Sequence, residues 1–366
     1  MTAPPRSRWL DVIAQVPREG FIPDVVYRHE WDRPAPNWVP VSRVQQPALW
    51  RRLVDAEDYV ITQVDDGHPS ADGSGYTPTS SASNPVVVAE MLDCLDLHPG
   101  HRVLEIGTGT GWNAALMASV VGAENVTSVE IDREVADHAR RALAGAGFDA
   151  VSVITGDGEA GWASTAPYDR VIATVGVYSI PGPWVTQTTL GGRLVVPLSN
   201  HYQHPGIAVL QRTRTGAYGR LAGRAVFMPL RAHRHPRISD GDWERAEQLP
   251  TTDSTTDQYP QDWISDRDAA TAIGQRIPDI ITDWQPDGDD AATGTLWLRT
   301  PDVTSWATLR LTDTPPPYRI EQAGPRKLLD EVAAAYQWWL DQRRPTVADW
   351  RISVDLTGEQ RIELVG

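Results

Sequence analysis

The sequence predicts an α/β fold in which helices cover both faces of a parallel sheet, followed by a smaller α+β domain. Short apolar runs alternate with helical patterns between residues 86 and 198, as in parallel strands joined by crossover helices. The length of 366 residues favours about two domains. A composition of 41% apolar and 22% charged residues indicates a chain that folds and buries a core.

The first elements along the chain are expected to be two helices and a loop. Apolar spacing within residues 9–24 predicts a helix that breaks at Pro17, and a second helix surrounds residues 49–56. Residues 65–85 are rich in Gly, Ser, Thr, Asp and Pro, which favours an irregular loop. A helix over residues 86–95 follows that loop directly.

Five apolar runs then predict the parallel strands, with helices through residues 115–121 and around 135–143 between the first three. The runs are VLEI, SVEI, VSVI, RVIAT and RLVVPL. Residues 207–211 and 224–230 predict two late strands that close the sheet at an edge. The first domain is therefore expected to span residues 1–235.

The charge distribution divides the rest of the chain. Residues 239–290 contain 14 acidic residues and 3 arginines, so an acidic linker is expected over residues 236–290. Beyond it, TGTLWLRT and SWATLRL alternate as a hairpin does, a helical pattern runs from Leu328 to Leu340, and two strand-like runs end the chain. Residues 291–366 are thus expected to form a C-terminal α+β domain that recognises a peptide.

Composition excludes several classes of function. A formal net charge of −15 disfavours nucleic acid and anionic membranes as main partners. Cys94 is the single cysteine, and there is no secretory or membrane-spanning run, so a cytoplasmic location is expected. Four histidines, at positions 201, 204, 233 and 235, lack a matching carboxylate pattern, so no metal is predicted.

The strongest motif is VLEIGTGTGWNAA, an apolar strand followed by Gly107, Gly109 and Gly111 and then a helix. Glycines at such a turn let the backbone approach a ligand beside free N–H groups of the helix. Glu130 ends the next strand about 20 residues later, where a carboxylate can accept both hydroxyls of a ribose. NAD and S-adenosylmethionine (SAM) both carry that ribose. Glu105, just before the glycines, suits the cationic SAM better than a pyrophosphate.

The third strand ends in the sequence GDG, which adds two candidate residues. Asp157 stands where its carboxylate can accept the amino hydrogen of an adenine, and Gly158 leaves the backbone open to the ring.

Taken together, the motifs resemble the protein-L-isoaspartate O-methyltransferase family. The similarity covers roughly residues 10–232 and is carried by VPREGFIP, SxSNPVVVAEML, VLEIGTGTGWNAA, SVEID, ITGDGEAGW, APYDRVIATVG, LGGRLVVPL and AVFMPL. The resemblance implies a class I SAM-dependent, Rossmann-like fold and methylation of a peptide carboxylate. It also implies SAM contacts at Glu105, Gly107, Thr108, Gly109, Glu130, Asp157 and Gly158, and a catalytic-pocket serine at Ser83.

Two features depart from the family pattern. Val86 stands where the family has Tyr or His to help hold the substrate carboxylate, and about 130 residues follow the matching region. Extended actinobacterial relatives, associated with graspetide and lanthipeptide maturation, methylate an ordinary aspartate. The leading hypothesis is therefore methylation of Asp in a ribosomally made peptide, with the ester closing to a succinimide or isoaspartate. Isoaspartate repair is the nearest alternative, a non-catalytic peptide-binding scaffold comes from another class, and nucleic-acid methylation ranks last.

The substrate site is expected around Ser83, whose hydroxyl would hold one carboxylate oxygen with help from Ser81 and Asn84. The carboxylate is already ionised, so no strong general base is required. A purely structural alternative makes Ser83 the N-cap of the helix that begins at Pro85. The expected partner is an acidic precursor peptide, and prior modification of that peptide by an ATP-grasp ligase is compatible with this expectation. Seven arginines between Arg212 and Arg237 either attract such a peptide or form a solvated hairpin edge.

Overall fold

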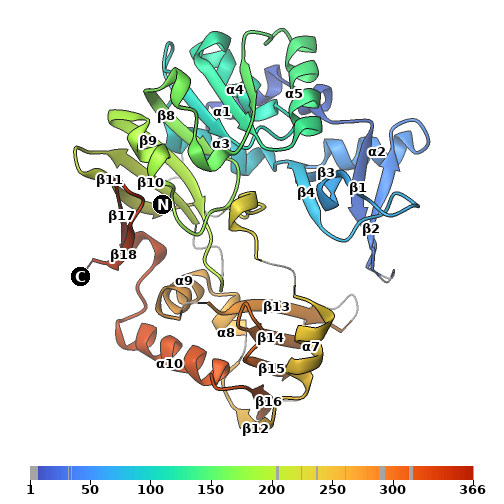
Figure 1. Cartoon of the computed structure of the whole chain (residues 1–366), viewed down its shortest axis with the longest axis vertical. Helices are drawn as coiled ribbons and strands as arrows, with labels where there is room; N and C mark the ends of the chain where they lie inside the picture. The colour runs from blue at the N-terminus through green and yellow to red at the C-terminus, as the bar shows by residue number, and fades with distance from the viewer. Residues whose placement is uncertain are drawn as a thin grey trace. The chain divides into compact units, whose positions relative to one another are not determined.

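The computed structural model describes residues 7–31, 33, 35–202, 206–223, 225–235, 238–259, 261–277, 279–287, 293–312 and 316–365. The chain forms two compact units (Figure 1). Unit 1 comprises residues 1–197, 207–232 and 352–361, and unit 2 comprises residues 198–206, 233–351 and 362–366.

Unit 1 is built on a nine-stranded sheet with the order β18-β17-β11-β10-β9-β8-β5-β6-β7. Its strands are β5 (Val103–Ile106), β6 (Val126–Glu130), β7 (Ser152–Thr155), β8 (Tyr168–Ala173), β9 (Thr188–Leu198), β10 (Gly206–Arg212), β11 (Gly216–Ala222), β17 (Trp350–Asp355) and β18 (Gln360–Leu364). The five predicted parallel strands and the first late strand are confirmed. The second late strand is β11, which lies before residues 224–230.

The centre of this sheet is parallel and contains a reversal of strand order. From β5 the chain proceeds outward to β6 and β7, then returns to β8 on the other side of β5. All four residues of β5 are buried, as expected of a central parallel strand covered on both faces. In such sheets a ligand crevice forms at the carboxyl ends of the strands beside the reversal. The loops after β5 and β8 meet there, since Thr174 N donates to the Ile106 carbonyl at 2.9 Å.

Helices pack against the sheet and share one apolar core with it. They are α1 (Trp9–Gln15), α3 (Pro85–Leu95), α4 (Trp112–Val121) and α5 (Arg133–Gly145). The short α6 (Gly182–Thr186) buries Trp184 and Val185 and contacts β11. The predicted helix at the N-terminus ends at Gln15, and a 3-10 turn, η1 (Arg18–Phe21), follows Pro17. The Trp112 indole donates to the Val16 carbonyl at 2.8 Å, which ties this segment to α4.

A four-stranded antiparallel sheet precedes α3 and has its own small core with α2 (Pro47–Asp55). Its strands are β1 (Val25–His29), β2 (Trp38–Ser42), β3 (Val60–Val64) and β4 (Pro78–Ala82), in the order β2-β1-β3-β4. The loop expected over residues 65–85 is therefore only partly irregular. Its second half forms β4, which pairs antiparallel with β3 across a register irregularity at Gln63. Ser80 and Ala82, two residues apart, supply its buried side.

Unit 2 contains a five-stranded antiparallel sheet with the order β12-β16-β15-β14-β13. Its strands are β12 (Thr251–Thr256), β13 (Ile281–Pro286), β14 (Gly294–Arg299), β15 (Trp306–Leu311) and β16 (Tyr318–Ala323), and its helices are α7 (Asp240–Glu247), α8 (Gln261–Ile264), α9 (Arg267–Arg276) and α10 (Leu328–Asp341). Alternate residues of β14 and β15 are buried, and α10 contacts β14, β15 and β16.

The domain boundaries differ from those expected in two respects. The acidic linker expected over residues 236–290 contains three helices and two strands among its described residues, because Trp263, Ala269 and Ile273 supply buried apolar contacts. The chain end does not remain with the C-terminal α+β domain. Strands β17 and β18 extend the edge of the nine-stranded sheet beyond β11, where an open strand edge offers backbone hydrogen bonds (Figure 1).

Candidate active site

The glycine turn after β5 requires glycine for steric reasons. Gly107 has φ +90°, and a Cβ atom there would lie 2.9 Å from both Thr174 Oγ1 and Val175 Cγ1. Gly109 has φ +54°, and its N–H donates to Glu130 Oε2 at 3.0 Å. The turn therefore fits tightly between the ends of β6 and β8. Its glycine N–H groups are used within the fold, since Gly107 N donates to the Val129 carbonyl at 2.8 Å and Gly111 N to the Thr108 carbonyl at 2.9 Å.

Glu105 is a buried support for this turn. None of its surface is exposed, and its two carboxylate oxygens accept hydrogen bonds from Asn113 Nδ2 at 2.7 Å and Ser128 Oγ at 2.5 Å. Burial raises the pKa of Glu105 to about 7, although both hydrogen bonds oppose that effect. The hydroxyl of Thr108 lies 2.6 Å from that of Ser128, so Thr108 also points inward. Direct contact of Glu105 or the Thr108 side chain with a cofactor stays a prediction that this geometry does not favour.

Glu130 lies at the carboxyl end of β6 and remains partly exposed. Its oxygens accept from the N–H groups of Gly109 and, at 3.1 Å, of Asp132. Burial raises the pKa of Glu130, which these hydrogen bonds oppose. A carboxylate held in this way keeps lone pairs for further donors. Backbone N–H groups on both sides therefore fix the Glu130 carboxylate, which is predicted to accept the pair of ribose hydroxyls.

The serine segment lies against the glycine turn. A Cβ atom at Gly109 would stand 3.4 Å from the carbonyl oxygen of Ser81. Ser83 follows β4 directly, and its hydroxyl makes no hydrogen bond with any residue that the structure describes. The buried Arg18 donates to the Ser83 carbonyl at 3.3 Å and also to the carbonyls of Val54, Ala56 and Asp58. The predicted substrate and cofactor segments thus meet in the folded chain.

The cap of α3 is Asn84 and not Ser83. The Asn84 side chain accepts from Val86 N at 2.8 Å and donates to the Glu57 carbonyl at 3.0 Å. Pro85 occupies the first helical turn, where its missing N–H costs nothing. The alternative reading of Ser83 as a helix cap is therefore wrong. Asn84 is already engaged by the fold, while Val86 is 46% exposed on the first turn of α3.

Asp157 and Gly158 follow β7 and differ in exposure. Asp157 is exposed and caps a short 3-10 turn, accepting from Glu159 N at 2.9 Å. Gly158 is buried, and a Cβ there would come within 2.6 Å of Ile106 Cγ2. Close packing on β5 accounts for this glycine, whereas its openness to an adenine ring stays a prediction.

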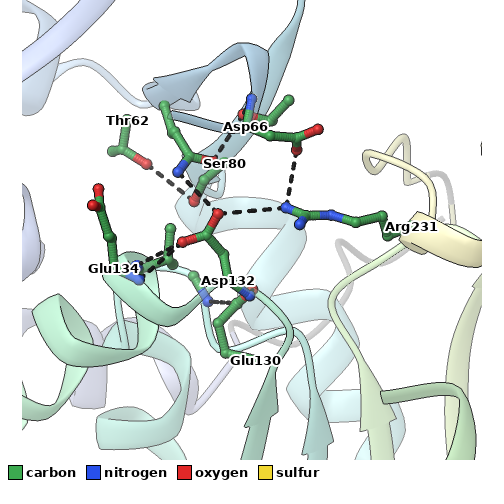
Figure 2. Close-up of polar contacts among 11 residues, drawn as sticks. Thr62, Asp66, Ser80, Glu130, Asp132, Glu134 and Arg231 are labelled. Carbon is green, nitrogen blue, oxygen red and sulfur yellow. Dashed lines mark hydrogen bonds and ion pairs between the residues drawn. The ribbon is translucent and has the colours of Figure 1, made fainter. Parts of the chain in front are cut away.

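Sequence reasoning missed several residues that organise the site (Figure 2). Asp132 caps α5 and accepts at 3.3 Å from Gln63 on β3. Arg231 pairs with both Asp66 and Asp132. No signal in a single sequence joins positions so far apart. For Arg18, the VPREGFIP motif contained the residue without indicating its contacts.

Two other sequence predictions concern metals and membranes. Among the described residues, no group of three or more His, Cys, Asp or Glu side chains has the geometry of a metal site. The rings of His201 and His235 stack edge to face, while His204, like Arg224 and Arg237 of the arginine run, falls outside the described residues. None of the described helices combines the length and apolar character needed to cross a bilayer.

Comparison with known proteins identifies the family. The model of the protein-L-isoaspartate(D-aspartate) O-methyltransferase family matches residues 53–234. A protein-L-isoaspartate O-methyltransferase of Methanothermobacter thermautotrophicus is 38% identical over 160 residues, covering 43% of this chain and 72% of the relative. The chain belongs to the protein-L-isoaspartate O-methyltransferase family. A second relative, protein-L-isoaspartate O-methyltransferase 1 of Archaeoglobus fulgidus, is 45% identical over 157 residues, covering 43% of this chain and 70% of the relative.

The family assignment confirms the resemblance, and the chain is a SAM-dependent carboxyl O-methyltransferase with a class I methyltransferase fold. A solved structure named protein-L-isoaspartate O-methyltransferase has the same fold, with a TM-score of 0.52 and 20% identity. The similarity covers 98% of this chain and 95% of that one, so it includes unit 2. The fold of the extra unit therefore has a counterpart in that solved structure.

Proposed function

We propose that this enzyme methylates the free carboxylate of an L-isoaspartyl residue in a peptide, with SAM as methyl donor. The observation that carries the proposal is the close approach of the Ser81 carbonyl to Gly109, where an added Cβ atom would lie 3.4 Å from the carbonyl oxygen. It sets Ser83, two residues further on, beside the turn expected to hold the donor. The unpartnered hydroxyl of Ser83 then supplies the hydrogen-bond donor that a carboxylate needs.

The residues around the turn fit SAM. Glu130 offers a carboxylate to the two ribose hydroxyls, and Ile131 beside it leaves an apolar side chain 39% exposed, which suits the face of an adenine. The turn contains no basic side chain, which agrees with a donor that carries a sulfonium in place of a pyrophosphate. When bound, SAM supplies an activated methyl group.

The protein's task in this reaction is alignment. A carboxylate is ionised at neutral pH, so Ser83 has to orient it and no group has to remove a proton. Arg18 fixes the Ser83 backbone by holding the carbonyls of the segments around it. Such positioning can supply up to about 7–11 kcal/mol of barrier reduction in favourable cases. A methyl ester formed in this way is activated toward attack by the next peptide nitrogen, which releases methanol and closes a succinimide.

A second candidate is methylation of an ordinary aspartate in a ribosomally made, modified peptide. Val86 favours it, because an exposed apolar side chain stands where the family has Tyr or His beside the substrate carboxylate. Valine offers no hydrogen bond to an isoaspartyl carboxylate, so the usual preference for that residue loses one determinant. Unit 2 would then bind the acidic precursor. Unit 2 alone does not separate the two candidates, since the similar solved structure includes it.

The experiment compares matched peptides. The purified enzyme is incubated with methyl-labelled SAM and three peptides that contain isoaspartate, aspartate, or aspartate within a side-chain macrocycle made by an ATP-grasp ligase. Label incorporation and methanol release from the isoaspartyl peptide support the first candidate. Methylation restricted to either aspartyl peptide supports the second. No methylation of any of the three, despite tight SAM binding, would leave the scaffold alternative.

Val86→Tyr is the matched variant for this comparison. Restoring the family's residue should raise kcat/KM for the isoaspartyl peptide by about tenfold, the value of one added hydrogen bond to a charged group. An equal rise for the aspartyl peptide would argue against a role of position 86 in selecting the substrate.

A further inference from the structure

Three separate segments of unit 1 meet at Arg231 (Figure 2). Its Nη2 lies 2.9 Å from Asp66 Oδ1 and 3.5 Å from Asp132 Oδ2. Asp66 belongs to the turn between β3 and β4, and Asp132 is the N-cap of α5. One guanidinium therefore connects the four-stranded sheet to the segment between β6 and α5 at the carboxyl end of the nine-stranded sheet.

The backbone places Arg231 with precision. The N–H of Gly176, after β8, donates to the Met228 carbonyl, and Leu230 N donates back to the Gly176 carbonyl, both at 2.9 Å. Arg231 follows directly after this pair of hydrogen bonds. Its Nε is buried and makes no hydrogen bond with the described residues. The guanidinium therefore keeps its two ion pairs although one of its donors, Nε, stays unsatisfied. This indicates an ordered side chain and not a mobile surface arginine.

The backbone of the Asp66 turn adopts a left-handed conformation that hydrogen bonds hold in place. Asp65 and Asp66 have φ values of 48° and 53°, in the left-handed region that few non-glycine residues adopt. The Asp65 carboxylate accepts from the N–H groups of Tyr76 and Thr77, and Asp66 N donates to Thr79 Oγ1. Asp tolerates this region better than most non-glycine residues, and these hydrogen bonds hold the turn in one conformation. Here the result is that the Asp66 carboxylate faces Arg231.

The other end of this contact is the predicted ribose carboxylate. Asp132 N donates to Glu130 Oε1 at 3.1 Å, so the residue that binds Arg231 also orients Glu130. The charged groups that act on Glu130 are Asp132, Arg231 and, from β5, Glu105. Burial and the negative charge of Asp132 raise the pKa of Glu130, and the positive charge of Arg231 lowers it. Arg231 is the cation in this group.

We propose that Arg231 is a positioning residue for the methyl donor. By pairing with Asp66 and Asp132 it holds the β3–β4 turn against the carboxyl end of β6, where Glu130 lies. Its charge favours the ionised form of Glu130, which accepts the ribose hydroxyls. This inference rests on the proposed function, because it assigns Glu130 to the donor. It concerns cofactor affinity and leaves the choice of peptide to other residues.

The test uses three variants and one control. Arg231→Gln removes the charge and both pairs, Arg231→Lys keeps the charge, and Asp66→Asn removes one anchor. Arg51→Gln is the matched control, since Arg51 also bridges two acids, Glu19 at 2.5 Å and Asp55 at 3.8 Å, on a helix without predicted site residues. Calorimetry measures the affinity for SAM and S-adenosylhomocysteine between pH 5 and 8. Turnover with a peptide that the wild-type enzyme methylates gives kcat and the KM for SAM.

Arg231→Gln is expected to weaken both ligands by about 5- to 30-fold, with kcat changed much less, because partly buried ion pairs contribute more than exposed ones. In this variant the loss of affinity on acidification should begin at a higher pH, because Glu130 is protonated more readily without the positive charge of Arg231. Arg231→Lys should lose affinity on acidification at the same pH as the wild type. Asp66→Asn should weaken affinity without shifting that pH. Arg51→Gln should change neither the affinity nor its pH dependence.

Two results would overturn the inference. One is an Arg231→Gln protein with a lower melting temperature but with the affinity and pH dependence of the wild type, which would make the contact structural only. The other is an equal loss of affinity in Arg51→Gln. A wild-type chain that binds no SAM at any pH would refute the proposed function itself, whereas tight wild-type binding with an unaffected Arg231→Gln refutes this inference alone.

Discussion

Replacing Glu105 with Gln tests the electrostatics at the centre of the site. The wild-type carboxyl is fully buried, with no cation among its hydrogen-bond partners, and burial raises its pKa from 4.5 to about 7. The native state therefore binds this proton more tightly than the unfolded chain. Stability is greatest when the carboxyl is protonated, decreases as pH rises from about 4.5 to 7, and levels off above the folded-state pKa.

The size of the effect follows from that difference in pKa. A tenfold change in proton affinity corresponds to about 1.4 kcal/mol, so keeping Glu105 ionised above pH 7 costs about 3 kcal/mol of unfolding free energy. Glutamine is neutral at every pH and can keep the network. Its carbonyl accepts from Asn113, and its amide donates to Ser128, whose hydroxyl hydrogen can then turn to Thr108.

Glu105→Gln is therefore expected to match the wild type near pH 4 and to exceed it by up to about 3 kcal/mol at pH 8. Denaturant unfolding followed by tryptophan fluorescence at several pH values measures this, with Glu90→Gln, at an exposed position on α3, as the control. A variant that is less stable than the wild type at pH 8, or that keeps the same pH dependence, would refute the reasoning. Affinity for S-adenosylhomocysteine should stay within a few-fold, whereas a large loss would restore Glu105 as a direct ligand.

Three further predictions concern other parts of the enzyme. Ser83→Ala should lower turnover by about 10- to 100-fold with donor affinity intact, whereas Glu130→Ala should weaken the donor by at least about tenfold; calorimetry with turnover assays would expose the reverse pattern. Gly107→Ala, with a Cβ 2.9 Å from Thr174 Oγ1, should cost about 1–3 kcal/mol of stability, and an unchanged melting temperature would contradict the packing. A chain ending at residue 349 loses β17 and β18 and should be poorly soluble; a stable, active product would show that these strands are dispensable.

Local sequence patterns predicted the features that depend on neighbouring residues. The alternation of apolar runs indicated the parallel strands, because a buried strand needs apolar side chains on both faces. The glycines after β5 and the acid after β6 were visible because their chemistry lies within a few positions of a strand end. The family resemblance joined these features into one order along the chain.

Tertiary structure decided where side chains point and which distant segments meet. Only the fold shows that Asn84 caps α3 while the Ser83 hydroxyl stays available, and that Glu105 faces inward to Asn113 and Ser128. Arg231 reaches Asp66 across 165 positions of sequence. Such contacts depend on how separate elements pack, and a residue's local neighbours carry no record of that packing. For the same reason the sequence predicts the strands at the end of the chain but not the sheet that they join.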